Sequence, residues 1–425
     1  MLDIKRIREN PGEARERLSY RGADASVVDA LMEMDRRRRE RITQVEALKQ
    51  ERNATSKEIG VRKQKGQSAE DLLAGMKEHS DRITALDAEC AELDREQEGL
   101  LLTLPNFPDS TVPPGRTSDD NPEVGRWGTA PVFDHPVKEH AELGEQSGWL
   151  DFAGAAKLSG SGFTVFKADG ARLQRALIQF MLDLHTGEHG YVEVSPPFLV
   201  REEAMVGTGQ LPKFREDMYA VEGGDLYLVP TAEVPVTNLF RETLLSEDEL
   251  PLKRCAYTPC FRREAGSAGR ETKGLIRMHQ FDKVELVRVV RPDQSAAALE
   301  SLRREAETVL ERLGLHYRTI ELCAGDLGFG AAKCYDIEVW APGTGLYLEV
   351  SSCSNFSDFQ ARRMQLRYKD ADKKNHFCHT LNGSGTALPR LIVALLETGQ
   401  QPDGSVLLPP ALHRHFGGDR MRPRT

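Results

Sequence analysis

The sequence predicts an α+β protein in which an N-terminal antiparallel helical coiled-coil arm precedes a larger domain of strands and helices. Two observations carry this expectation. Apolar stripes with helical spacing run through residues 28–100 and are interrupted by one short segment between glycines. Beyond a proline-rich stretch at 105–131, short β-prone runs alternate with amphipathic helical patterns.

Length, charge and cysteine content limit the functions to consider. A chain of 425 residues, 39% of them hydrophobic, has room for two or three domains and a buried core. The net charge of −9 means that any nucleic acid would contact a local basic patch. Seven cysteines without a CxxC pair, and no apolar signal core or membrane-length apolar run, predict a reduced cytoplasmic protein.

The first hundred residues carry the predicted arm, after a short helical lead-in over residues 1–27. The first stripe comprises Leu31, Met34, Arg38, Arg41, Val45, Leu48, Arg52, Thr55 and Ile59. The second comprises Met76, Ile83, Leu86, Cys90, Leu93, Gln97 and Leu100. Gly60 and Gly66 bracket VRKQK, which we expect at the tip. Two helices of roughly 35 residues would give an arm on the order of 50 Å long.

Opposite charges divide between the two predicted helices. Residues 36–65 hold eleven Lys or Arg against four Asp or Glu, whereas residues 70–98 hold three against ten. These charges can pair across the seam, or the first helix can present its excess positive charge to a phosphate backbone. Charge alone leaves both interpretations open. The arm has no Phe, Trp or Tyr, which favours recognition of nucleic-acid shape over stacking on unpaired bases.

The larger domain is predicted over residues 132–425. Helical periodicity from Arg172 to Thr186 leads into GYVEVSPPFLV, a strand that prolines interrupt. A β-prone run then reaches Thr231 and Glu233, whose hydroxyl and carboxylate can hold an ammonium group or simply cap a helix. Further on, residues 296–313 predict a charged amphipathic helix connecting elements at the surface.

A strand–loop–strand segment at residues 255–285 has a composition suited to a nucleotide. Arg262 and Glu264 end its first predicted strand and share a face, because side chains alternate with a period of two. The glycine-rich loop and second strand add Arg270, Lys273, Arg277 and Phe281. Arginine can donate two hydrogen bonds to a phosphate, glutamate can accept a hydrogen bond from an exocyclic amine, and phenylalanine can stack on a base. A solvated hairpin with scattered charges explains the segment equally well.

The last third of the chain supplies a strand pair and a buried helix. Glu349 and Ser352 end the second strand, LYLEVSSCSN, and their oxygens suit Mg²⁺, although a glutamate near a strand end more often simply faces solvent. In HTLNGSGTALPRLIVALLE, NGSG predicts a tight turn and Pro389 the first turn of a buried helix. The final GGDRMRPRT is expected to be disordered.

Taken together, these motifs resemble the class II aminoacyl-tRNA synthetases. F-R-x-E with its long glycine-rich loop resembles motif 2, and FRREAGSAGRETKGLIRMHQFDKVE resembles its seryl-tRNA synthetase form. The helix before GYVEVSPPFLV resembles motif 1, which forms the dimer interface in that family. Gly383, Gly385 and Arg390 resemble motif 3, although Pro389 stands where the family often has glycine. Thr-Ala-Glu resembles the serine-binding loop, and EVSSCSN the ATP- and metal-binding strand.

The resemblance to bacterial-type seryl-tRNA synthetases implies a fold and a set of partners. We expect an N-terminal tRNA-binding domain at 1–104, a linker at 105–131 and a catalytic domain at 132–425. The class II domain would have a mostly antiparallel sheet of six to seven strands flanked by helices, and would form a homodimer. It would attach L-serine to tRNA(Ser) with ATP through seryl-adenylate, with tRNA(Sec) as a further candidate substrate. The arm would grip the tRNA outside the anticodon.

The resemblance also assigns roles to individual residues. Arg262 and Arg390, expected on the α- and γ-phosphates, are the predicted catalytic residues. Glu264 would read the adenine amine and Phe281 would stack on the base. The predicted ATP-binding residues are Arg262, Arg263, Glu264, Phe281, Glu349, Val350, Ser351, Ser352 and Arg390, with Mg²⁺ on Glu349 and Ser352. The predicted serine-binding residues are Thr231, Ala232, Glu233, Glu285, Asn382 and Ser384.

Two other classes of function stay open. A related carrier-protein ligase would load the amino acid onto a thiol, but such relatives lack the arm. A catalytically inactive relative could act as a coiled-coil binding module, but it would be expected to have lost Arg262, Glu264 or Arg390. No zinc site is expected, because the spacing of His376, Cys378 and His379, or of Cys255 and Cys260, does not match zinc ligands.

Overall fold

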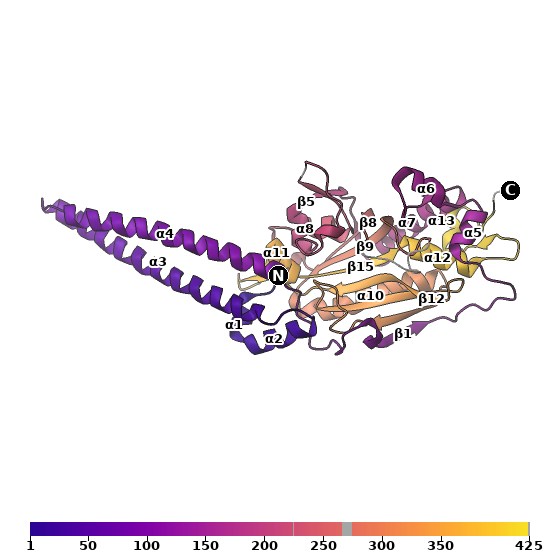
Figure 1. Ribbon diagram of the computed structural model, residues 1–425, viewed down its shortest axis with the longest axis horizontal. Helices are drawn as coiled ribbons and strands as arrows, with labels where there is room; N and C mark the ends of the chain where they lie inside the picture. The colour runs from indigo at the N-terminus through magenta and orange to yellow at the C-terminus, as the bar shows by residue number, and fades with distance from the viewer. Residues whose placement is uncertain (224, 266–273, 424–425) are drawn as a thin grey trace. The chain divides into compact units, whose positions relative to one another are not determined.

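The computed structural model of the protein describes residues 1–223, 225–265 and 274–423. The chain divides into two compact units (Figure 1). The smaller contains Leu2–Leu104, and the larger contains Met1 and Pro105–Thr425. Arg270 and Lys273 of the predicted nucleotide loop lie outside the described residues.

The smaller unit is helical and contains the predicted arm. Its helices are α1 (Ile4–Glu9), α2 (Pro11–Tyr20), α3 (Val27–Gln64) and α4 (Glu70–Leu102). The two long helices lie antiparallel along each other (Figure 1). Val45, Ile83 and Leu86 form a buried cluster between them. The tip differs from the prediction: α3 continues through Gly60, and the chain turns around Gly66, which has a φ of +70°.

Ion pairs join the two arm helices across the seam. Arg41 lies 2.7 Å from Glu89, and Arg38 pairs with Asp94. Lys49–Asp87 (3.4 Å) and Arg62–Asp71 (3.0 Å) extend the series toward the tip. Arginines on the predicted apolar stripe therefore belong to the seam because the facing helix supplies carboxylates.

The larger unit is built on a sheet with eight described strands, in the order β1-β10-β11-β12-β15-β9-β8-β4. Every neighbouring pair is antiparallel except β4 with β8, which confirms the mostly antiparallel sheet. The strands are β1 (Glu123–Trp127), β4 (Val192–Glu193), β8 (Leu252–Phe261), β9 (Gln280–Val290), β10 (Tyr317–Glu321), β11 (Lys333–Ala341), β12 (Leu346–Asn355) and β15 (His379–Ala387). The sheet exceeds the expected six to seven strands because β1, from within the segment predicted as a linker, adds an edge.

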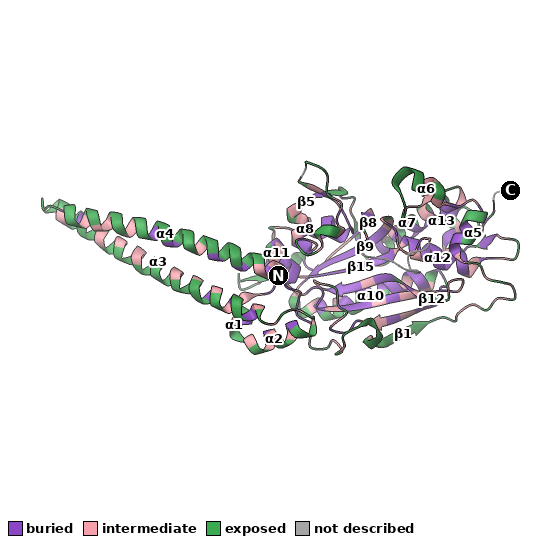
Figure 2. Cartoon of the chain, in the orientation of Figure 1, coloured by how far each residue is buried: buried purple, intermediate pink, exposed green. Residues whose placement is uncertain are grey.

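Three helices cover the sheet: α7 (Asp169–Gly187), α10 (Ser295–Arg312) and α12 (Leu388–Gly399). All three contribute to one large core, and buried residues concentrate in the sheet and the helices against it (Figure 2). Helix α10 was expected as a surface connection. It packs on β12 and β15 instead, because Leu299, Leu302 and Val309 align on one face.

Shorter elements surround this layer. The helices are α5 (His140–Gln146), α6 (Phe152–Ser159), α8 (Glu202–Thr208), α9 (Glu233–Asn238), α11 (Phe359–Met364) and α13 (Pro410–Phe416). The strands are β2 (Leu150–Asp151), β3 (Val165–Phe166), β5 (Leu199–Arg201), β6 (Leu226–Leu228), β7 (Leu244–Ser246), β13 (Arg367–Lys369), β14 (Asn375–Phe377), β16 (Val406–Leu407) and β17 (Arg420–Met421). Pairing of β16 with β17 corrects the expectation of a disordered tail, since Met421 is buried there. None of the described helices is both long and apolar enough to cross a bilayer.

Candidate active site

A cavity of about 850 Å³ lies in the larger unit and gathers most of the predicted site residues. Its lining includes Thr231, Glu233, Arg262, Glu264, Phe281, Glu285, Glu349, Val350, Ser352, Asn382, Ser384 and Arg390. These residues come from segments far apart in the sequence. The sheet and the start of α12 bring them around one space.

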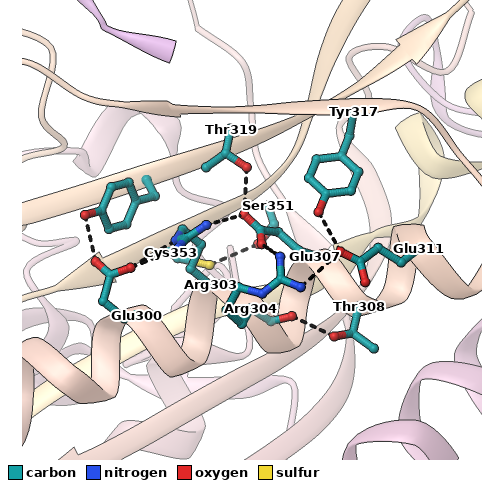
Figure 3. A network of polar contacts seen from close by, with 11 residues as sticks. Glu300, Arg303, Arg304, Glu307, Thr308, Glu311, Tyr317, Thr319, Ser351 and Cys353 are labelled. Atoms are coloured by element: carbon teal, nitrogen blue, oxygen red, sulfur yellow. Dashed lines mark hydrogen bonds and ion pairs between the residues drawn. The ribbon is translucent and has the colours of Figure 1, made fainter. Parts of the chain in front are cut away.

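Three predicted residues lie outside the cavity lining. Ala232 is fully buried next to α9, and the guanidinium of Arg263 lies 6.0 Å from the ring of Tyr219. Ser351 is buried, and its Oγ donates to the carbonyl of Ser384 at 2.6 Å. In Figure 3 it lies in the polar network where α10 packs on the sheet, around Glu307. The side chains of these three residues are therefore not placed to contact a ligand in the cavity.

A β-bulge explains why Glu349 and Ser352 share the cavity. Side chains three apart on a regular strand point to opposite faces. In the pairing of β12 with β11, Ser351 lies opposite Ile337 and Glu349 opposite Glu338, so that Val350 is an extra residue. The bulge lets both Glu349 and Ser352 line the cavity, which their spacing in the sequence does not reveal.

The arginine–glutamate pair reaches the cavity in a different way from that predicted. Strand β8 ends at Phe261, and Glu264 lies beyond it with a φ of +50°. Arg262 is held by a 3.3 Å hydrogen bond from its Nε to the carbonyl of Pro230. Its guanidinium lies 5.1 Å from the ring centroid of Phe281, and Glu264 pairs with Arg277 at 3.0 Å.

Gly383 and Gly385, the glycines of the predicted motif 3, allow close packing against buried neighbours. Residues 382–385 continue strand β15, so the predicted tight turn is wrong. A Cβ on Gly383 would lie 2.8 Å from Cys353 Sγ, and one on Gly385 would lie 2.6 Å from His185 Nε2. Side chains at both positions would collide with buried neighbours, so glycine is required without any turn.

Arg390 projects from the first turn of α12 to the cavity. Its Nη1 donates to the carbonyl of Glu349 at 2.8 Å, and its Nε donates to the carbonyl of Ile276 at 3.1 Å. These bonds fix the direction of a guanidinium that lines the cavity, which suits it to an anionic group.

A small acidic pocket with one buried lysine forms another part of the cavity lining. Phe281, Lys283 and Glu285 alternate along β9 and share its cavity face. Lys283 forms an ion pair with Glu285, and its Nζ donates to Thr231 Oγ1 at 2.8 Å. Lys283 was not among the predicted site residues, although the same alternation identifies it.

Burial changes the acidity of Glu233 in this pocket. Desolvation, reinforced by the nearby carboxylate of Glu285, raises the pKa of Glu233 to about 7. Gln360 donates to Glu233 Oε1 at 2.6 Å, and Thr380 donates to Gln360 Oε1 at 2.6 Å. The hydroxyl thereby fixes the orientation of the Gln360 amide, and no motif in the sequence indicated either residue.

The oxygen donors fit a hard divalent cation bound together with phosphates. Glu349 and Ser352 both line the cavity from β12, and Asp336, on β11, lies opposite Ser352. Burial and the Glu349 carboxylate raise the pKa of Asp336 to about 8. The raised pKa of Asp336 indicates excess negative charge at this position, which a cation would relieve.

Comparisons with known proteins agree across the chain. Residues 218–399 match the "tRNA synthetase class II core domain (G, H, P, S and T)" and residues 1–108 match the "Seryl-tRNA synthetase N-terminal domain". The serine–tRNA ligase of Akkermansia muciniphila is 57% identical over 424 residues, covering 100% of this chain and 99% of the relative. That of Carboxydothermus hydrogenoformans is 54% identical over 99% of both chains.

Solved structures extend the likeness to the fold. Seryl-tRNA synthetase from Pyrococcus horikoshii, complexed with ATP, superposes with a TM-score of 0.93 at 39% identity over 100% of both chains. Prolyl-tRNA synthetase from Giardia lamblia shares only the fold, with a TM-score of 0.56 at 17% identity over 64% of this chain and 53% of that one.

The antiparallel sheet, the long helical arm and the matched core domain define a class II aminoacyl-tRNA synthetase. Full-length identity above one half then identifies the group within that class. The chain belongs to the seryl-tRNA synthetase family of serine–tRNA ligases.

Proposed function

We propose that the enzyme charges tRNA with serine in two steps in this cavity. The serine carboxylate attacks the α-phosphorus of ATP, giving seryl-adenylate and releasing pyrophosphate. The 3′-terminal ribose hydroxyl of tRNA(Ser) then attacks the seryl carbonyl and releases AMP. The observation that carries this proposal is a single cavity whose lining combines arginine side chains with a small acidic pocket. Positioning and charge neutralisation would supply most of the catalysis.

The arginines of the cavity lining are assigned to ATP. Arg262 would neutralise the α-phosphate, and Arg390 would hold the γ-phosphate. Phe281 would stack on the adenine, and Glu264 would accept from its amine. Glu349 and Ser352 would hold Mg²⁺, which when bound neutralises charge on the phosphates.

The acidic pocket is assigned to serine. Thr231 and Glu285, which already hold the Lys283 ammonium, offer the same oxygens to the ammonium of serine. A buried carboxylate such as Glu233 on the serine hydroxyl would disfavour alanine, because alanine would leave that carboxylate without a partner. Asn382 and Ser384 complete the small lining that would exclude threonine.

The remaining assignments concern partners and location. We assign tRNA binding to the domain at 1–104 and catalysis to the domain at 132–425, with tRNA(Sec) as a second candidate substrate. Partly exposed apolar side chains near the predicted motif 1, Val192, Phe198 and Leu199, support a homodimer formed there. We place the enzyme in the cytoplasm, where its tRNA and ATP substrates are present.

The decisive experiment is amino-acid-dependent ATP–pyrophosphate exchange with all twenty amino acids and Mg²⁺, without tRNA. We expect exchange with serine alone. Arg262→Gln and Arg390→Gln should each lower the exchange rate about 100-fold or more, because each removes charge that stabilises the transition state. Arg414→Gln, on the exposed face of α13, is the matched control and should exchange normally.

Other outcomes would select a different function. Exchange with another amino acid would keep the class and refute the serine pocket. No exchange by folded protein would favour a binding module that has lost activity. Exchange with serine but transfer to a carrier thiol in place of tRNA would favour the carrier-protein ligase.

A further inference from the structure

A fully buried histidine–glutamate pair lies outside the cavity, behind a segment of its wall. His140, the first residue of α5, is 1% exposed, and Glu397, in the second half of α12, is 0% exposed. Neither side chain lines the cavity, and the proposed mechanism uses neither of them.

The Glu397 carboxylate receives hydrogen bonds from four N–H groups. Its Oε1 accepts from the backbone of His140 at 3.0 Å and lies 2.9 Å from Nδ1 of the same residue. Its Oε2 accepts from the backbones of Gly343 at 2.8 Å and Thr344 at 3.0 Å. These donors stabilise the buried charge and tie the β11–β12 turn and the start of α5 to α12.

The far side of the His140 ring contacts the cavity wall. Its Nε2 lies 3.1 Å from the backbone nitrogen of Leu275. That N–H can only donate, so Nε2 is the acceptor, and the ring proton lies on Nδ1, which donates to Glu397. Gly274 permits this approach, because its φ is +69° and a Cβ there would lie 2.3 Å from Nε2.

The segment of the cavity wall at residues 275–276, which His140 contacts, also contacts Arg390. Leu275 and Ile276 line the cavity, and the Ile276 carbonyl accepts from Arg390 Nε at 3.1 Å. Arg390 and Glu397 belong to the same helix. The wall segment is therefore attached to α12 twice, directly at Arg390 and through His140 at Glu397.

We propose that His140 is a positioning residue for ATP. It links the fixed carboxylate of Glu397 to the backbone of Leu275 and so holds the wall segment on which Arg390 is oriented. This inference rests on the proposed function, because it assumes that Arg390 binds a phosphate of ATP.

Two substitutions at His140 separate positioning from bulk packing. His140→Asn keeps an amide N–H near the Nδ1 position, for Glu397, but loses the acceptor for Leu275. His140→Gln extends an amide oxygen toward the Nε2 position and can restore that acceptor. In pyrophosphate exchange we expect His140→Asn to raise the KM for ATP about tenfold with the KM for serine unchanged. His140→Gln should return the KM for ATP to within about twofold of wild type.

His316→Asn is the control for general loss of stability. His316 is also buried and bonded at both nitrogens, to the Trp127 carbonyl at 2.7 Å and the Tyr347 hydroxyl at 2.8 Å, but lies outside the cavity lining. We expect it to lower Tm without changing either KM. Should His140→Asn fail to fold, Gly274→Ala disturbs the same contact from the loop side and should raise the KM for ATP selectively.

The outcomes that overturn the inference are distinct from failure of the proposed function. An unchanged KM for ATP in the His140→Asn and Gly274→Ala variants, or a parallel rise of both KM values, removes the positioning role while wild-type exchange persists. Absence of serine-dependent exchange in the wild type refutes the proposed function, and the positioning role with it.

Discussion

Burial of Glu233 opposes the ionised form of its carboxyl group, which the proposed binding of serine requires. Its carboxyl group is buried, and desolvation and Glu285 raise its pKa to about 7. Lys283 compensates only part of the charge of two buried carboxyl groups, because its ion pair is with Glu285. A serine ammonium would supply the missing positive charge, so substrate binding should favour the ionised form of Glu233.

The raised pKa predicts a pH dependence for serine use. The ionised fraction of Glu233 rises as pH increases through about 7, so kcat/KM for serine in pyrophosphate exchange should rise about tenfold between about pH 6 and about pH 8. Below this pKa the protonated carboxyl group of Glu233 is a weaker hydrogen-bond acceptor for the serine hydroxyl. It also carries no charge to attract the serine ammonium.

Glu233→Gln tests the assignment. The amide does not titrate, so the variant should have a lower kcat/KM for serine and a flat profile over the same range. If the wild type were flat, or if the variant kept the wild-type slope, another group would be responsible for the titration.

Single residues differ in how far the sequence reveals them. Arg262 and Arg390 belong to sequence motifs, so they can be identified without knowing which residues contact them in the fold. Gln360 reaches Glu233 only because α11 packs on α8, which in turn packs on α9, and such contacts between distant segments leave no local pattern. The roles assigned to the motif residues stay predictions until variants are measured.

At the scale of elements, α3 carries arginines that pair across the seam and arginines that do not. Arg38 and Arg41 face α4 and pair with Asp94 and Glu89. Their neighbours Arg37 and Arg39 are exposed and, among the described residues, form no ion pair. A helix presents consecutive residues in different directions, so seam pairing accounts for only part of the arginine run.

The unpaired arginines predict a salt-dependent contact with tRNA. The Arg37→Gln, Arg39→Gln double variant should weaken tRNA(Ser) binding and reduce the slope of log Kd against log salt concentration by up to about two. Filter binding over a salt series measures this slope, and serine-dependent exchange should be unchanged.

The matched control is the Arg38→Gln, Arg41→Gln double variant. It removes the same charge from the same helix but breaks seam pairs, so it should lower the stability of the arm with a smaller change in slope. A wild-type slope for the Arg37→Gln, Arg39→Gln variant would mean that the exposed arginines make no phosphate contact.

The spacing of residues in the sequence predicts some elements of the fold and misses others. The stripes in residues 28–100 predicted two long helices because heptad-like spacing is a local signal. The bulge at Val350 and the strand through Gly383 and Gly385 depend on the register of neighbouring strands. Register is set by partners elsewhere in the chain, so neither feature could be obtained from the local sequence.

At the scale of the whole molecule, the cavity and the arm belong to different parts of the chain. All residues that line the cavity lie between Thr208 and Arg390, within the larger unit. The helices of the arm lie within Leu2–Leu104. The sequence predicted this α+β organisation because a change in periodicity and a proline-rich stretch are visible without any tertiary contact.

This separation predicts that removal of the arm will leave formation of seryl-adenylate intact and impair the charging of tRNA. Residues 36–97 can be replaced by a short linker, because the Arg38–Asp94 pair shows that the cut ends are neighbours across the seam. Serine-dependent pyrophosphate exchange should persist, since no cavity residue is lost. Charging of tRNA(Ser) should fall by about 100-fold or more, because the phosphate contacts that hold the tRNA would be missing. Unchanged charging by the truncated enzyme would refute the role of the arm, and loss of exchange would show that the catalytic domain depends on it.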